Sequence, residues 1–150
     1  MPLEPPPQQL LTKAQILRDH LSREGNSRVG QRARIEHLRL HFLAAKLGLV
    51  FGLGAAAFGL KKFDLAEQSF RKAVELEPEI TQAHANLGVL LYQQEKLQGA
   101  LEAFANAIKT NPQYAEGYNS IGGIYHKLGK FDQAEKYYVG AIQANKNYAE

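Results

Sequence analysis

Residues 81–112 read TQAHANLGVLLYQQEKLQGALEAFANAIKTNP, and a shift of 34 residues in either direction aligns this stretch with another copy of itself. Three positions of the period hold the same kind of residue in every copy: glycine at Gly54, Gly88 and Gly122, alanine at Ala66, Ala100 and Ala134, and an aromatic ring at Phe70, Phe104 and Tyr138. A fixed period of this length is typical of a solenoid, in which each unit buries its apolar face against its neighbours.

Each unit is predicted to be a pair of helices. Apolar residues recur at helical spacing within residues 81–94 and again within residues 97–109. Gly88 and Ala100 are small enough to let the paired helices approach, and Phe104 is expected to fill the space toward the next unit. Pro78 and Pro112 end the first two units, because proline cannot continue a helix, whereas the third unit has a lysine there. The sequence therefore predicts an all-α fold.

The pattern resembles the tetratricopeptide repeat over about two thirds of the chain. On this alignment three tandem repeats occupy residues 47–80, 81–114 and 115–148, and the chain ends at the start of a fourth. The bulky residue usual at the fourth repeat position is replaced by Val50 and His84, and only Tyr118 fits it. The resemblance implies a right-handed superhelical solenoid of helix-turn-helix repeats. It also implies a concave face, lined by the first helix of each repeat, that binds peptides or protein surfaces.

The resemblance further implies which side chains line that groove. The predicted partner-binding residues are Gln82, Asn86, Val89, Tyr92, Gln93, Glu116, Asn119, Ser120, His126 and Lys127. The amides of Asn86 and Asn119 suit sequence-tolerant binding of an extended peptide backbone, and the alternative is that they are simply solvated. Family members that clamp an acidic carboxy terminus use lysine, arginine and asparagine at five positions. Those positions here are Phe51, Ala55, Asn86, Glu116 and Ser120, so only Asn86 matches and no such clamp is expected.

Composition places the chain among soluble globular proteins, with 45% hydrophobic and 22% charged residues. The absence of cysteine excludes disulfides and thiolate metal sites. The first residues, MPLEPPPQQLL, lack a basic stretch followed by an apolar core, so no secretory signal is visible. The expectation is an intracellular, cytoplasmic protein.

The segment before the repeats has its own character. Residues 1–11 are proline-rich and are expected to be a disordered lead-in. Residues 12–46 are expected to form one or two basic helices, the second over residues 31–46. From Lys13 to Lys46 there are eight Lys or Arg and three Asp or Glu, a net charge of +5. A basic amphipathic segment suits an anionic membrane surface, and the alternative is a solvated cap on the first repeat. Nucleic-acid binding is not favoured, since few aromatic residues accompany the arginines.

Residues 47–60, LGLVFGLGAAAFGL, are open to three interpretations. They carry no charge but number 14, fewer than the roughly 20 residues of a membrane span. Gly52, Gly54 and Ala57 imitate a dinucleotide-binding fingerprint, although no parallel-sheet pattern follows them. The register of Leu53 and Gly54 with the later repeats favours the first helix of repeat one. Membrane insertion is the second interpretation and nucleotide binding the third.

No catalytic or metal-binding arrangement is evident from spacing. His37 and His41 lie one helical turn apart, but the zinc-protease pattern H-E-x-x-H is absent. The prediction is a protein without enzymatic activity, metal or cofactor, which acts as an interaction scaffold for complex assembly. One alternative is a membrane-tethered assembly factor anchored through residues 28–60. A second is the substrate-binding or regulatory part of a larger enzyme such as a glycosyltransferase, because the asparagine at repeat position 6 is similar to that in O-linked N-acetylglucosamine transferase.

The end of the third repeat adds one further expectation. No capping helix follows it, so Phe131, Tyr138 and Ile142 are expected to face water. Exposed apolar residues at the end of a solenoid favour stacking on another chain. Self-association through this flank is therefore predicted.

Overall fold

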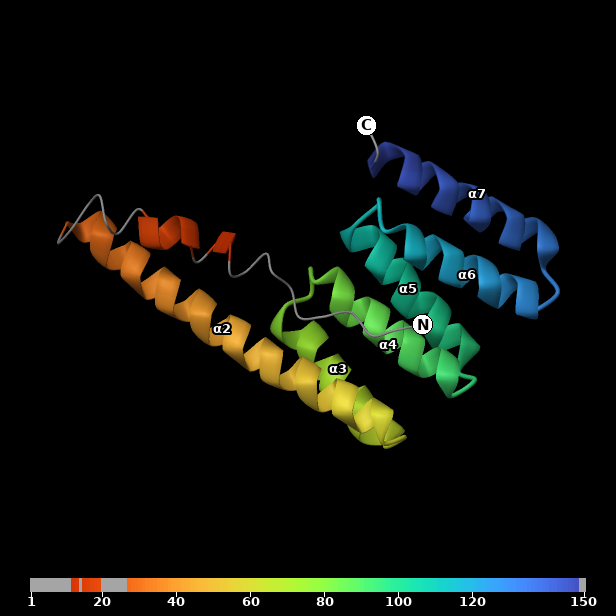
Figure 1. Ribbon diagram of the computed structural model, residues 1–150, viewed down its shortest axis with the longest axis horizontal. Helices are drawn as coiled ribbons and strands as arrows, with labels where there is room; N and C mark the ends of the chain where they lie inside the picture. Colours follow the sequence, from red (N-terminus) through yellow and green to blue (C-terminus); the bar gives the residue numbers. More distant parts are fainter. Residues whose placement is uncertain (1–11, 14, 20–26, 149–150) are drawn as a thin grey trace.

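The computed structural model describes residues 12–13, 15–19 and 27–148, and the predicted lead-in lies outside this range. Residues 12–13 and 15–19 are helical. Six longer helices follow, namely α2 (Arg28–Gly59), α3 (Phe63–Leu76), α4 (Thr81–Gln93), α5 (Leu97–Thr110), α6 (Ala115–Lys127) and α7 (Phe131–Tyr148) (Figure 1). The described part of the chain contains no β-strand, which confirms the all-α prediction.

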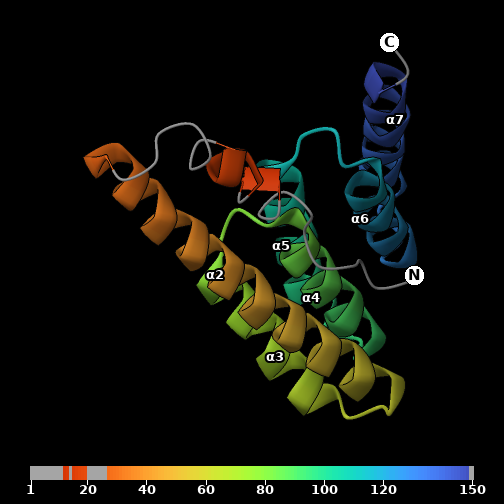
Figure 2. The same ribbon diagram turned by 60° about the vertical axis from the view of Figure 1, so that its left-hand side comes forward.

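The helices stack as three consecutive pairs. α2 packs against α3, α4 against α5 and α6 against α7, while α3 also contacts α4 and α5 contacts α6 (Figures 1 and 2). The second helices α3 and α5 each contain 14 residues. α7 contains 18 residues, because Lys146 stands where the earlier units have a helix-ending proline. Each pair therefore corresponds to one unit of the 34-residue period.

Close approach within each pair depends on glycine. A Cβ atom added to Gly54 would lie 2.6 Å from the ring of Phe70, and one added to Gly88 would lie 2.8 Å from the ring of Phe104. The third pair repeats this contact between Gly122 and Tyr138. The ring of Phe104 thus fills space inside its own pair, whereas the sequence analysis assigned it to the gap before the next unit. Both rings of the first two pairs are fully buried.

The turn between the two helices of a pair is the same in all three units. One residue of each turn has a positive φ: Lys61 at 57°, Glu95 at 59° and Gly129 at 71°. The residue after it donates a backbone hydrogen bond across the turn, as from Lys96 N to Leu91 O at 2.9 Å. This is the helix-ending arrangement in which a left-handed residue lets the chain satisfy the last helical carbonyls. Two of the three turns place a side chain where glycine fits best.

α2 is a single helix of 32 residues. Ser27 caps it, because the Ser27 Oγ atom accepts a hydrogen bond from Gly30 N at 3.0 Å. The expected boundary between residues 46 and 47 falls inside this helix, so the basic segment and the first helix of repeat one are continuous. The second half of α2 packs on α3, and its first half extends beyond the other repeats (Figures 1 and 2). No proline interrupts residues 28–59, so nothing in the chain forces a break.

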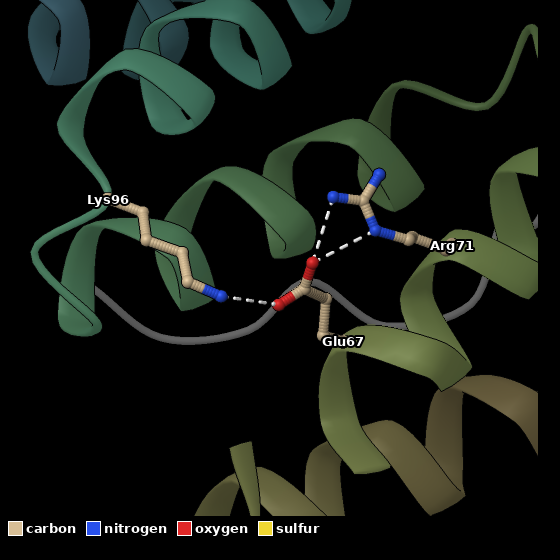
Figure 3. Close-up of polar contacts among 3 residues, drawn as sticks. All are labelled: Glu67, Arg71 and Lys96. Carbon is tan, nitrogen blue, oxygen red and sulfur yellow. Dashed lines mark hydrogen bonds and ion pairs between the residues drawn. The ribbon is translucent and has the colours of Figure 1, made fainter. Parts of the chain in front are cut away.

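An ion-pair cluster ties the first repeat to the second (Figure 3). The Glu67 carboxylate of α3 accepts hydrogen bonds from Arg71 Nη2 at 2.8 Å and from Lys96 Nζ at 3.0 Å. Burial acts to raise the pKa of the Glu67 carboxyl, but the hydrogen bonds and positive charges of Lys96 and Arg71 outweigh it. The net result is a pKa below the ordinary value for Glu67. Lys96 belongs to the turn of the second repeat, so the cluster bridges two adjacent units.

Candidate functional site

The ten predicted groove residues lie on α4 and α6, and they differ in accessibility. Asn86 is 1% exposed and Val89 is 4% exposed, so neither side chain is available to a partner in this structure. The other eight are at least partly accessible, and we call them the groove residues: Gln82, Tyr92, Gln93, Glu116, Asn119, Ser120, His126 and Lys127.

Asn86 lies within a continuously buried stretch of α4, residues 83–91. This helix packs on α5 of its own pair and on α3 of the preceding pair. The Asn86 side chain is also already engaged in an interaction. Repeat numbering placed Asn86 on the concave side, but numbering alone does not report how closely the neighbouring segments cover that side. Its burial does not favour partner binding, and the predicted binding role of Asn86 stays a prediction.

A three-residue contact joins repeats two and three on this face. Lys127 of α6 lies with its Nζ atom 2.6 Å from Glu95 Oε2 and 5.3 Å from the centre of the Tyr92 ring. The hydrogen bond with Glu95 is the main reason that the pKa of Lys127 is raised. Glu95 therefore neutralises the cation, which lies over one face of the half-buried Tyr92 ring. We call Tyr92, Glu95 and Lys127 the tyrosine–lysine contact.

Glu95 is not among the residues that the repeat pattern predicted for this face. The signal for it was present, because Glu95 occupies the left-handed turn position that Gly129 fills in the third repeat. A glutamate there projects from the turn and reaches α6 of the next unit. The position could therefore have been identified by asking which residue replaces the glycine.

The remaining groove residues fall into separate places. Glu116 and Asn119 line an open hollow of about 490 Å³ that they share with Tyr138 and Ile142 of α7. His126 makes an edge-on ring contact with Phe131, with the ring centres 5.2 Å apart. The structure thus brings together Tyr92 and Lys127, and it places Glu116 and Asn119 at the outer flank of the third repeat.

That flank is the surface for which self-association is predicted. Phe131 is 61% exposed and Ile142 is 57% exposed, in agreement with the sequence analysis. Tyr138 is only partly exposed, because its ring packs on Gly122 rather than facing water. Self-association through this flank stays a prediction.

The positions of the acidic-tail clamp provide no free cation. Phe51 is buried at 3% exposure, Asn86 is buried, and Glu116 carries the charge opposite to the one a clamp needs. Of the groove residues only Lys127 is cationic at neutral pH, and Glu95 holds it. An acidic peptide would therefore gain little electrostatic attraction from this face.

Metal-binding groups are not clustered in the part of the chain that the structure describes. No three His, Cys, Asp or Glu side chains lie close enough there to share an ion. His37 and His41 contact each other edge-on with ring centres 4.4 Å apart, which makes a pair only. A stable site for zinc takes three or four protein ligands.

The fold and this face define a class of protein: a solenoid of helix pairs with an accessible polar and aromatic surface on the first helices. The model of the tetratricopeptide repeat family matches residues 51–115 and 90–149, which is more than half of the chain. The chain belongs to the tetratricopeptide repeat family. Among curated protein sequences, none matches it.

Solved structures with the same fold are numerous. The crystal structure of MamA aligns with a TM-score of 0.67 at 22% identity, covering 95% of this chain and 82% of MamA. The first repeat domain of Spaghetti (RPAP3), solved with the HSP90 peptide SRMEEVD, aligns with a TM-score of 0.63 at 21% identity, covering 69% of this chain and 82% of that one. These similarities confirm the predicted tetratricopeptide-type solenoid.

Proposed function

We propose that this protein is an interaction scaffold that binds an extended segment of a partner protein across α4 and α6 and so assembles a complex. The observation that carries the proposal is the tyrosine–lysine contact, which holds an accessible aromatic ring at the junction of two repeats. Rigid aromatic side chains contribute much of the binding energy at protein interfaces. Gln93, next to Tyr92 in α4, is exposed and offers an amide donor and acceptor.

An extended partner suits the shape of this surface. The hollow beside Asn119 and Glu116 is open and not enclosed, so it fits a chain lying along the helices better than a small molecule held inside. The Spaghetti repeat domain was solved with a bound peptide, which supports peptide binding by this fold. Because the clamp cations are missing here, we propose a neutral or polar segment rather than an acidic carboxy terminus.

We propose that the protein acts by binding and carries out no chemistry of its own. Support comes from the open shape of the hollows and from the scattering of the titratable groove residues Glu116, His126 and Lys127 over separate contacts. General acid–base catalysis needs such groups within hydrogen-bond reach of one reacting atom. The scaffold role therefore fits the arrangement better than catalysis does.

The test is selection of peptides from a random displayed library against the full chain, followed by affinity measurement with variants. Tyr92→Ala is expected to weaken the selected peptides by about tenfold, which corresponds to about 1.4 kcal/mol. Lys127→Met, which frees Glu95 and removes the cation beside the ring, is expected to weaken them also. The matched control Lys109→Met removes an exposed lysine of α5 that is not one of the groove residues.

Peptides that bind equally well to Tyr92→Ala and to the wild type would contradict the proposed surface. Circular dichroism of each variant separates a loss of binding from a loss of fold. If no peptide is enriched over a display without the protein, the extended-segment proposal is wrong.

A further inference from the structure

α2 exposes a narrow apolar stripe that the repeat stack does not use. Six large apolar side chains on this helix are more than half exposed, and all but Val29 lie along one side: Ile35 at 58%, Leu38 at 67%, Phe42 at 75%, Leu49 at 76% and Leu53 at 51%. With about 100° of rotation per residue, these five side chains fall within about 60° of one another around the helix. We call them the α2 stripe. It runs along both the projecting first half of α2 and the half that belongs to repeat one.

The α2 stripe lies nearly opposite the packed side of the same helix. Leu47, Phe51, Gly54 and Ala57 are the buried residues of the second half, and they point toward α3. Gly54 touches the ring of Phe70, and the rings of Phe51 and Phe70 lie 6.4 Å apart. Packing on α3 and exposure of the stripe therefore do not compete, since they use different sides of α2.

Basic side chains border the α2 stripe along both edges. On the same helical projection, Arg28, Arg39 and Lys46 follow one edge and Arg34 follows the other. Residues 28–59 contain one acidic residue, Glu36, which pairs with Arg39 at 2.9 Å. An apolar stripe with arginine and lysine on its flanks is typical of helices that lie in the interface of an anionic membrane.

We propose that α2 lies in the plane of an anionic membrane surface, with the α2 stripe inserted among the lipid chains and the flanking cations on lipid phosphates. By length and composition α2 is also apolar enough to cross a membrane, and only 22% of an apolar 18-residue window of this helix is buried. The charge of the lipid headgroups complements the basic edges, and the exposed apolar side chains gain a nonpolar environment. This inference concerns a different surface from the groove residues and does not rest on the proposed function.

The same residues argue against a membrane span. The first half of α2 would bring Arg32, Arg34 and Arg39 into hydrocarbon, where arginine is strongly disfavoured. The second half would have to leave α3 and expose the contact of Gly54 with Phe70. An in-plane helix keeps the arginines in the headgroup layer and leaves the contact with α3 intact.

The basic edges also argue against a second copy of the chain as the occupant. Two copies that paired their stripes would bring rows of arginine and lysine against each other, and like charges placed together are unfavourable. A surface of opposite charge removes that repulsion. Among the occupants considered, the anionic lipid surface is the one that matches both the apolar centre and the basic edges.

The experiment is flotation of the full chain with vesicles of phosphatidylcholine alone and of phosphatidylcholine mixed with phosphatidylserine. The expected result is flotation with the phosphatidylserine vesicles that falls as salt is added, because salt screens the headgroup charge. An alkaline wash is expected to release the protein, which distinguishes an in-plane helix from a spanning one.

Two pairs of matched variants distinguish binding through the α2 stripe from nonspecific adsorption to the vesicles. Phe42→Gln with Leu49→Gln is expected to lower the floating fraction several-fold, whereas Phe131→Gln with Ile142→Gln, which removes similarly exposed side chains from α7, is expected to leave it unchanged. Arg34→Gln with Lys46→Gln is expected to reduce flotation, whereas Lys130→Gln with Lys136→Gln is not. All eight positions are exposed, so the fold is retained.

The chain contains no tryptophan, so Phe42→Trp provides a single optical reporter in the stripe. Its emission is expected to shift to shorter wavelength with the anionic vesicles, and the emission of an Ile142→Trp control is expected to stay constant. The proposal is overturned if the full chain does not float with phosphatidylserine vesicles, or if Phe42→Gln with Leu49→Gln floats as well as the wild type. It is also overturned if sedimentation shows a dimer that this double variant abolishes without any vesicle binding.

Discussion

Replacing Gly88 by alanine tests the close approach that organises each helix pair. Two effects oppose each other in this variant. Alanine inside a helix is favoured over glycine by about 0.5–1 kcal/mol, which would stabilise the protein. The new Cβ atom, however, would lie 2.8 Å from the Phe104 ring, whereas ordinary contacts start at 3.4 Å. Phe104 is 1% exposed and so has little room to retreat.

Gly52→Ala is the matched control, because Gly52 also lies inside a helix but has no atom within 4 Å of an added Cβ. Both variants gain the same helical preference, so the difference between them isolates the cost of the contact with Phe104. Overpacking of a well-packed core costs about 1–3 kcal/mol. We expect Gly52→Ala to be more stable than the wild type and Gly88→Ala to be less stable than Gly52→Ala by that amount.

The measurement is urea unfolding of both variants followed by circular dichroism at the helical wavelength. A double-mutant cycle with Phe104→Leu identifies the partner, because a smaller side chain makes room for the new methyl group. We expect a coupling of about 1 kcal/mol in favour of the double variant. If Gly88→Ala proves as stable as Gly52→Ala, the glycine is not required by the Phe104 ring and the explanation of the repeat position is wrong.

Two further predictions concern the turns and the ion pairs. Glu67→Gln is expected to destabilise the protein by about 0.5–1 kcal/mol near neutral pH, since it breaks the pair with Arg71 within α3 and the pair with Lys96 that joins two repeats. The folded-state pKa of Glu67 lies below its ordinary value of 4.5, so the stabilisation is present above pH 4.5 and is lost as the pH falls through the lowered pKa. Urea unfolding at a series of pH values should therefore show the variant and wild type converging in acid, and parallel curves would contradict this. Lys61→Gly replaces a residue with a φ of 57° and is expected to raise the free energy of unfolding by up to about 1 kcal/mol. The control Lys62→Gly, at a φ of −84°, is expected to lower it. Thermal unfolding compares the two variants, and equal midpoints would contradict backbone strain at Lys61.

Much of the fold follows from the period of the sequence. Small residues at Gly54 and Gly88 predicted that two helices approach closely in every unit, and the contacts with Phe70 and Phe104 confirm this. Proline predicted where the second helices end, and its absence near Lys146 accounts for the longer α7. These features could be predicted from the sequence because each depends on a few neighbouring residues and recurs in the three repeats.

Other features depend on contacts that no single stretch encodes. The segments before and after Lys46 were each predicted to be helical, but as two separate helices. In the structure they form the single helix α2, because no residue between them interrupts it. Asn86 was predicted to bind a partner from its repeat position, but the position in the repeat does not give the burial that Asn86 has in the folded chain. Glu95 was missed because its role depends on Lys127 in the next repeat. Predicting such roles requires knowing which residues lie next to a position in the folded protein.

The continuity of α2 has a mechanical consequence. A helix of 32 residues is about 48 Å long, at a rise of about 1.5 Å per residue. Its second half packs on α3, and each unit is joined to the next by helix packing, of α3 on α4 and of α5 on α6. Whatever the first half rests on is therefore held at a set angle to α4 and α6. The molecule transmits orientation along its length, so a cargo bound on the groove residues would be presented in one direction.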